Sequence, residues 1–521
     1  MKPIRYVALL LFALFSGSIA IAQTGEILTP PPPATPRING PAVYGERPGR
    51  PFLYTIPTTG DRPMTFAVDG LPDGLTLDPS NGRISGSVAK AGTYDVVLRA
   101  HNDKGDDHKK FAIIIGDEIC LTPPMGWNSW NVWRGDVDQG KVVAAAEAMA
   151  NTGLINHGWT YVNIDDTWQG LRGGPLNAIQ PNHKFPDMKQ LCDQIHALGL
   201  KAGIYSTPWE TSYAGYCGGS ASNPQGTWRP IPKGTKVPFN KNVLPHGIGP
   251  YHFMKQDAQQ WAEWGFDYLK YDWNPIEPPD VKEMADALRN SGRDFVFSLS
   301  NSAPFPGAAD WAKMSNSWRT TGDIRDDWRH LLRFDAQDKW ARYCGPGHYN
   351  DPDMLEIGLV TGAHGPRPTN LTPDEQYLHI SAWCLLSAPL LLGNDMSKMT
   401  PFTLSLITND EVLAVDQDTL CKQAVIIARD RDTGALVMAK PLDDGSEAVG
   451  LFNIGLHPTE VTVKFESIGV TGARVVRDLW RQKDLGSFQG QFAAMVHPHG
   501  VVFVKVEPIS YSPVAADGTN H

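Results

Sequence analysis

The sequence of 521 residues has no cysteine pair spaced as CxxC and no HExxH motif. These absences argue against a zinc cage, a dithiol redox centre and a zinc-protease site. There is also no long run of basic residues, and the formal net charge is −10. Nucleic acids and anionic membranes are therefore not expected as partners. Only six cysteines occur, without the spacing of a compact disulfide framework; Cys192 and Cys384 lie in apolar helical patterns and are expected to be buried thiols.

One long apolar stretch is present, from Tyr6 to Ile21, behind the basic residues Lys2 and Arg5. Together with the small residues Ala20 and Ala22, it is typical of a signal peptide over 1–22, cleaved before Gln23. It is slightly shorter than the about 20 residues that a membrane span needs, and no other segment is as long and apolar. We expect a protein secreted or exported to the periplasm, with no membrane span in its mature form. A retained N-terminal anchor is the alternative.

The next segments predict a linker and a β domain. Pro30–Pro33 and Pro36 indicate a stiff, proline-rich linker over 23–37. Over 38–116, short apolar or alternating runs are separated by Gly, Asn and Asp, which predicts a β-sandwich. The stretches 70–78 and 82–86 resemble immunoglobulin-like modules of bacterial surface and secreted enzymes. Such modules serve as spacers, docking surfaces or sugar binders.

Residues 117–422 change to short apolar strands that alternate with helical periods. Eight strand candidates within roughly 275 residues are typical of a (β/α)₈ barrel. A doubly wound open sheet is the alternative, although no glycine-rich phosphate loop follows any strand. From 423 to 510 the pattern returns to strands, which predicts a C-terminal antiparallel β-sandwich, and 511–521 are expected to form a disordered tail.

Functional groups of barrel enzymes gather at the C-terminal ends of the strands. The polar and aromatic residues predicted at those ends are Trp130, Asp165, Asp166, Tyr205, Lys270, Asp272, Asn301, Arg319, Asp323 and Asp353. A ring of carboxylates with aromatic neighbours suits glycoside chemistry, in which two carboxyl groups flank the scissile bond. Clustered carboxylates also bind divalent metals. Lys270 and Arg319 are interleaved with the acids and reduce the need for a metal, so neither a metal nor another cofactor is expected.

Six ordered motifs occur in this region: 125–131 (MGWNSWN), 163–168 (NIDDTW), 203–206 (GIYS), 270–272 (KYD), 318–323 (WRTTGD) and 350–355 (NDPDML). They resemble the motifs of glycoside hydrolase family 27, the α-galactosidases and α-N-acetylgalactosaminidases. The resemblance extends from about Leu121 to Pro508.

By this resemblance, Asp272 is the nucleophile and Asp323 the general acid/base of a retaining exo-glycosidase. The resemblance also implies that terminal α-D-galactosyl residues of oligo- or polysaccharides are the substrate. Asp165 and Asp166 would hold the axial 4-hydroxyl and the 6-hydroxyl of galactose. The sugar would pack on Trp130, and the pocket would be lined by Tyr205, Lys270, Arg319 and Asp353.

Simple electrostatics adds two expectations about these acids. Lys270 lies two residues before Asp272 on the same face of a strand, and it should favour the ionised nucleophile. Asp323 should keep its proton near neutral pH, because a second carboxylate at about 5.5 Å disfavours its ionisation.

The sequence departs from the family pattern in three places. Two cysteine pairs of the family are replaced, by Thr167 with Gly135 and by Asn274 with a residue near Tyr213, so the barrel should not depend on disulfides. A Pro/Gly-rich insertion spans 217–251, and Trp209 and Trp228 are candidates for a further sugar subsite. Strand five ends in Asn301-Ser302, where the family has Glu-Trp near the 2-substituent of the sugar.

The last departure leaves other activities of the same family open: α-N-acetylgalactosaminidase, β-L-arabinopyranosidase and isomaltose-releasing glucanase. Asp165 and Asp166 favour a galactose-like ring. An inactive carbohydrate-binding or adhesive protein is the alternative from another class. The presence of both Asp272 and Asp323 argues against it.

Overall fold

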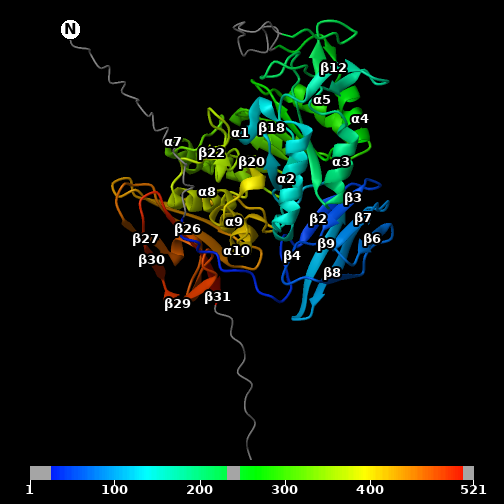
Figure 1. The fold of residues 1–521 in the computed structure, drawn as a ribbon. Helices are drawn as coiled ribbons and strands as arrows, with labels where there is room; N and C mark the ends of the chain where they lie inside the picture. Colours follow the sequence, from blue (N-terminus) through cyan, green and yellow to red (C-terminus); the bar gives the residue numbers. More distant parts are fainter. Residues whose placement is uncertain (1–24, 231–246, 509–521) are drawn as a thin grey trace, which may run out of the picture.

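The computed structural model describes residues 25–230 and 247–508. The predicted signal peptide, the C-terminal tail and part of the 217–251 insertion lie outside these residues. The described chain forms three domains, with a central barrel, an N-terminal β domain and a C-terminal β domain (Figure 1). The three-domain prediction is therefore confirmed.

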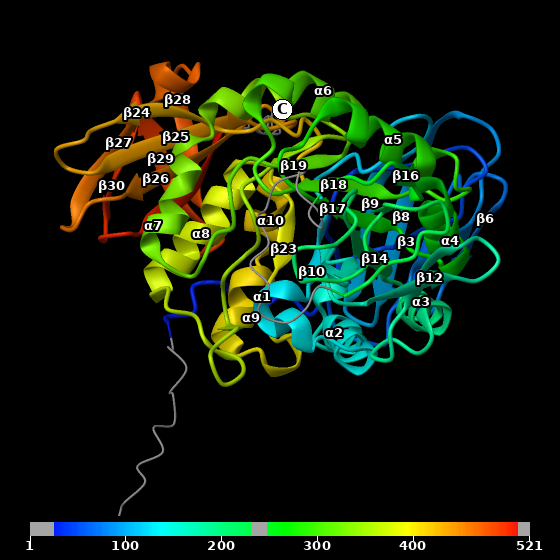
Figure 2. The ribbon, with the colours of Figure 1, turned by 90° about the horizontal axis from the view of Figure 1, so that it is seen from above.

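The barrel consists of eight parallel strands that are neighbours in chain order. Leu355, just beyond the seventh strand, bridges to Leu392 of the eighth, so the ring closes. The open doubly wound alternative is therefore wrong. Figure 2 shows the strands inside a ring of helices. The strands are β10 (Met125–Asn128), β11 (Tyr161–Asn163), β14 (Lys201–Ser206), β17 (Tyr268–Asp272), β18 (Val296–Ser300), β19 (Ser317–Arg319), β20 (Tyr349–Asp351) and β23 (Leu390–Leu392).

Helices cover the barrel, and α3 (Met188–Ala197), α4 (Met254–Trp264) and α5 (Pro278–Arg289) among them are amphipathic. In α3 the apolar face predicted from the sequence is buried, and Asp187 caps the helix by accepting from the Gln190 amide. The covering helices also include α2 (Gln139–Asn151), α6 (Ala308–Met314) and α8 (Pro373–Leu385). None of the helices in the described residues is both long and apolar enough to cross a membrane.

The N-terminal domain is a sandwich of a four-stranded and a three-stranded sheet. The first contains β2 (Val43–Glu46), β5 (Thr65–Asp69), β8 (Gly92–Asn102) and β9 (Gly105–Ile115), and the second β3 (Phe52–Thr55), β6 (Leu75–Asp78) and β7 (Arg83–Gly86). The sequence did not indicate β9, whose first half is polar and largely exposed.

This domain docks on the N-terminal ends of the barrel strands. Lys201, the first residue of β14, donates to the Tyr44 hydroxyl and lies 3.8 Å from the carboxylate of Glu46. Arg47 forms an ion pair of 2.7 Å with Asp294, which precedes β18. The module therefore covers the end of the barrel opposite the strand ends that carry the predicted site.

The C-terminal domain consists of a six-stranded sheet and a two-stranded sheet, both antiparallel. It is anchored to the barrel by Trp480, whose indole NH donates to Ser381 of α8 at 2.9 Å. The sequence did not indicate β28–β30. The strands are β24 (Val425–Arg429), β25 (Ala435–Pro441), β26 (Glu447–Asn453), β27 (Thr459–Lys464), β28 (Ala473–Asp478), β29 (Lys483–Gln489), β30 (Gln491–Val496) and β31 (Val501–Pro508).

Candidate active site

Asp272 is the last residue of β17, at the C-terminal end of the barrel, and only 8% of it is exposed. Its Oδ2 accepts a hydrogen bond of 3.0 Å from the hydroxyl of Tyr205, on the adjacent strand β14. Its Oδ1 is buried and has no hydrogen-bond partner within the described part of the chain. One oxygen of this carboxylate is therefore held in place, while the other is left for a reaction partner.

Lys270 lies two residues before Asp272 and donates to Oδ2 of Asp165 at 2.7 Å. Its ammonium group lowers the pKa of Asp272, as expected from the sequence. Burial has the larger effect, however, and with the negative charges of Asp165 and Asp323 it raises the pKa of Asp272 to about 7.

Asp323 lies on the loop after β19, and its side chain is 73% exposed. Arg319, the last residue of β19, contacts Oδ1 of Asp323 at 3.2 Å and Oδ2 of Asp353 at 2.9 Å. Burial is the largest single influence and would raise the pKa of Asp323. The positive charges of Arg319, Lys270 and Arg325 together outweigh burial, so the pKa of Asp323 is lowered from its ordinary value. The expectation that Asp323 keeps its proton near neutral pH is therefore wrong for the protein without substrate.

Asp165 and Asp166 are both buried at the end of β11, but their surroundings differ. Asp165 is paired with Lys270, whereas Asp166 accepts four hydrogen bonds from the protein. These come from Thr167 N (2.7 Å), Gln169 Nε2 (3.0 Å), Ser212 Oγ (2.8 Å) and Ala214 N (2.9 Å). Asp166 therefore anchors the loop after β14, a role that the sequence did not indicate.

Several non-glycine residues at the strand ends have a left-handed backbone. The φ angles are 86° at Thr167, 82° at Asn301, 62° at Ser302 and 91° at Asp353. Such conformations cost free energy and often cluster at functional sites.

The aromatic candidates have different environments. Trp130 is partly buried and packs on the apolar cluster inside the barrel, which includes Tyr161 and Met354. Trp209 is completely buried, so its indole is a core side chain and the prediction that it shapes a further sugar subsite is wrong. Trp228 is partly buried and donates to the hydroxyl of Thr211 at 3.0 Å.

All six cysteines are free thiols, and the prediction that Cys192 and Cys384 are buried is confirmed. Over 25–230 and 247–508, no group of three or more His, Cys, Asp or Glu residues is arranged to hold a metal ion.

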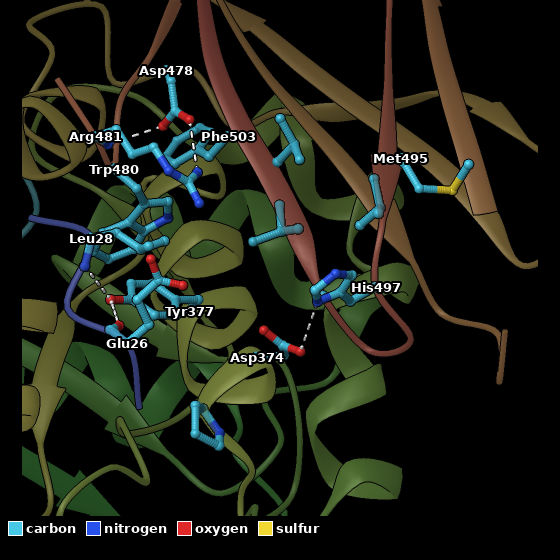
Figure 3. A pocket seen from close by; sticks show the side chains of 15 residues that line it. Glu26, Leu28, Asp374, Tyr377, Asp478, Trp480, Arg481, Met495, His497 and Phe503 are labelled. Carbon is cyan, nitrogen blue, oxygen red and sulfur yellow. Dashed lines mark hydrogen bonds and ion pairs between the residues drawn. The ribbon is translucent and has the colours of Figure 1, made fainter. Parts of the chain in front are cut away.

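A separate hollow lies between the N-terminal segment, α8 and the C-terminal domain (Figure 3). None of the predicted site residues lines it. Two pairs of its polar groups contact each other: Arg481 donates to Asp478 at 2.9 Å, and His497 lies 3.6 Å from Asp374. The reactive arrangement is therefore the one at the strand ends.

A (β/α)₈ barrel with an acid-rich site at its strand ends and a C-terminal β-sandwich is typical of glycoside hydrolases. Comparison with known proteins agrees. The family model described as "Alpha galactosidase A" matches residues 122–225 and 242–418, and that for the "Alpha galactosidase C-terminal beta sandwich domain" matches 432–506. A model for Ig domains matches 35–116. The chain belongs to the α-galactosidase family, glycoside hydrolase family 27, as the motifs predict.

Individual relatives support this assignment. The chain is 36% identical to α-galactosidase 2 of Arabidopsis thaliana over 397 residues, which is 74% of this chain and 90% of that protein. A solved structure from Bacteroides fragilis, named as a candidate α-galactosidase/melibiase, aligns with a TM-score of 0.80 at 32% identity and covers 92% of this chain and 99% of that one. A β-L-arabinopyranosidase from Geobacillus stearothermophilus aligns with a TM-score of 0.63 at 29% identity, over 75% and 98% of the two chains.

Proposed function

We propose that this protein hydrolyses terminal α-D-galactosides with retention of configuration, with Asp272 as nucleophile and Asp323 as general acid/base. The observation that carries the proposal is the state of Asp272. It is buried at a strand end, one oxygen is held by Tyr205, and the other has no partner among the described residues. A carboxylate held in this way is prepared to attack a sugar carbon.

In the first step, Oδ1 of Asp272 forms a bond to the anomeric carbon while Asp323 gives its proton to the departing glycosidic oxygen. In the second step, Asp323 takes a proton from water, and the resulting hydroxide oxygen displaces Asp272 from the same carbon. Both carboxyl groups thus return to their starting states. The exposed position of Asp323 suits this exchange with the leaving group and with water.

The pair must hold one proton, and that proton must be on Asp323 when the sugar reacts. In the protein without substrate, the proton favours Asp272, since its pKa is raised and that of Asp323 is lowered. The active form is therefore a minor protonation state of a coupled pair. Arg319 sets this balance, because it contacts Asp323 directly.

The family and the Asp165–Lys270 pair support a galactose-like substrate. Lys270 fixes one oxygen of Asp165, and the carboxylate can accept from an axial hydroxyl of the sugar. The Geobacillus relative gives a second candidate, β-L-arabinopyranoside, which has the galactose ring without its exocyclic CH₂OH group.

Two measurements on an aryl α-galactoside test the proposal. Turnover should exceed that of the aryl β-L-arabinopyranoside, and proton NMR should show α-galactose as the first product. A β-sugar as the first product would refute retention, and faster turnover of the arabinoside would replace the proposed substrate.

We also propose that the protein acts outside the cytoplasm. Lys2, Arg5 and the apolar stretch that follows support this proposal. N-terminal sequencing of protein from the native cell should give a chain that begins at Gln23. A chain that retains Met1 in the cytoplasm would contradict it.

A further inference from the structure

Asp323 lies on the loop 320–327 that follows β19. Its side chain is 73% exposed and contacts Arg319 at 3.2 Å. Packing therefore contributes little to holding the carboxyl group, and the backbone of the loop determines where it lies. The neighbouring Ile324 amide donates to Oδ2 of Asp353 at 2.8 Å, which fixes this part of the loop to the end of the seventh strand.

The far end of the same loop is held by Asp326, a carboxylate that is only 7% exposed. It accepts two hydrogen bonds from the guanidinium group of Arg367, at 2.5 Å on Oδ2 and at 3.1 Å on Oδ1. Its Oδ2 also accepts from the amide of Asn370 at 2.7 Å. A bidentate, charge-assisted pair of this kind fixes direction as well as distance. The loop is therefore tied in place three residues beyond Asp323.

Arg367 belongs to a hairpin that follows the seventh strand. It is the first residue of β22 (Arg367–Pro368), which pairs antiparallel with β21 (Leu359–Val360). Leu359 in turn accepts from the amide of Asp395, just beyond the eighth strand, at 2.8 Å. Arg367 therefore extends from a support that is bonded to the rim of the barrel and reaches the loop after the sixth strand.

Removal of the guanidinium group would leave the Asp326 carboxylate buried, with the Asn370 amide as its remaining donor in the described part of the chain. A buried charge without its counter-charge is strongly unfavourable, so this end of the loop would move until water reaches the carboxylate. Asp272 and its partner Tyr205 lie on other strands, β17 and β14. The movement would therefore displace the acid and leave the nucleophile in place.

We propose that Arg367 is a positioning residue for the acid/base: through Asp326 it holds the loop so that Asp323 meets the departing glycosidic oxygen. The inference rests on the proposed function, in which Asp323 gives its proton to that oxygen. Because proton donation is the step that depends on this placement, the loss of Arg367 should matter most where the leaving group most needs a proton. A purely structural pair would instead affect all substrates alike.

The test is the dependence of kcat/KM on the leaving group, measured with a series of aryl α-galactosides. In Arg367→Ala, kcat/KM should fall roughly 10-fold for weakly acidic phenols, a part of the 10²–10⁴-fold that a positioned acid supplies. For strongly acidic phenols, which leave with little protonation, it should stay within about twofold of wild type. Arg367→Lys keeps the charge but not the two-pronged geometry, and should give an intermediate loss.

A variant without the acid shows whether Arg367 acts through Asp323. In the Asp323→Ala background, Arg367→Ala should cause no further change in the leaving-group dependence, because no acid remains to be positioned. Asp326→Asn removes the partner charge without leaving a buried charge, and should reproduce the effect of Arg367→Ala. If Arg367→Ala does not fold, Asp326→Asn and Arg367→Lys carry the same test.

The matched control is Arg329→Ala. Arg329 is an exposed arginine of α7 (Trp328–Leu331), the helix that follows the loop. Its removal should leave the leaving-group dependence unchanged.

A loss in Arg367→Ala that is equal for all leaving groups, or no loss for any of them, would overturn the positioning role while the proposed function stands. A further steepening of the dependence when Arg367→Ala is added to Asp323→Ala would overturn it as well. If Asp323→Ala itself kept the leaving-group dependence of the wild type, the proposed role of Asp323 would fail, and the inference with it.

Discussion

The hydroxyl of Tyr205 donates to Oδ2 of Asp272 at 3.0 Å and leaves Oδ1 of that carboxylate without a partner in the described residues. This hydrogen bond fixes the orientation of the carboxylate and therefore the position of the reactive Oδ1. It also stabilises the ionised form of a carboxylate that burial would otherwise keep protonated. The predictions below follow from this pair and from its neighbours.

The two carboxyl groups should respond differently to removal. Asp272→Ala should abolish turnover of every substrate, because no nucleophile remains. Asp323→Ala should lose roughly 10²–10⁴-fold on substrates with poor leaving groups and far less in the glycosylation step of activated aryl substrates. Equal losses of Asp323→Ala on good and poor leaving groups, measured for that step, would remove its assignment as the acid.

The pH dependence of kcat/KM should show which of the two carboxyl groups must be protonated and which must be ionised. In the wild-type protein, kcat/KM should fall above about pH 7, where the pair loses its shared proton. In Asp323→Ala with an activated substrate, only Asp272 must be ionised, so the rate should rise with pH to a plateau. Its midpoint should be below about 7, because the negative charge of Asp323 no longer raises the pKa of Asp272. A falling limb near pH 7 that persists in this variant would contradict the account.

The N-terminal module should make stability depend on pH through Glu46. Burial raises the pKa of this carboxyl from 4.5 to about 7, although Lys201 opposes the rise. A raised folded-state pKa stabilises the fold fully below the unfolded value, and this stabilisation is lost as pH rises toward about 7. In the wild type, Glu46 should lower the free energy of unfolding by up to about 3 kcal/mol between pH 4.5 and 7. Glu46→Gln should remove this decrease.

Urea titrations at several pH values measure this effect. The exposed Glu466, replaced by Gln, is the matched control and should leave the pH profile unchanged. A wild-type protein that becomes more stable from pH 5 to pH 7, by an amount that Glu46→Gln removes, would reverse the predicted sign.

Substrate preference should reflect Asn301, which lacks the charge of the glutamate that the family resemblance implies at this position. Aryl α-galactoside should have the highest kcat/KM, with looser discrimination at C2 than such a glutamate would give. If α-N-acetylgalactosaminide were preferred by more than about tenfold, which is the most that one neutral hydrogen bond contributes, the substrate assignment would be wrong. A preference for α-glucoside would instead refute the role of Asp165 at the axial 4-hydroxyl.

The barrel should not depend on oxidised cysteines, since all six thiols are free. Mild reductant should leave activity and the melting temperature unchanged within about 1 °C. A large drop in melting temperature would reveal a disulfide.

The sequence predicted the barrel well because buried parallel strands are short apolar runs between regular helical periods. It missed β9 and β29, in which many residues are polar or exposed and the alternation is weak. These strands are specified by their partners in the sheet rather than by their own pattern.

The sequence predicted which residues form the site, but not the hydrogen bonds and ion pairs between them and their neighbours. Asp166 was assigned to the sugar, yet it accepts four hydrogen bonds from the protein, and two of the donors, Ser212 and Ala214, lie on a loop that is distant in the sequence. Tyr213 attracted attention only as the place of a missing cysteine, because the bonds from its neighbours Ser212 and Ala214 to Asp166 exist only after folding. The lowered pKa of Asp323 had a visible signal, since Arg319 lies four residues before it.

The central claim is that Asp272 forms a covalent bond with the sugar, and peptide mapping after inactivation tests it most directly. A fluorinated α-galactosyl fluoride slows the second step and should accumulate the glycosyl-enzyme. The account predicts a mass increase of one fluorogalactosyl group on the peptide that contains Asp272, and none in Asp272→Ala. An active enzyme labelled at another carboxyl group would contradict it.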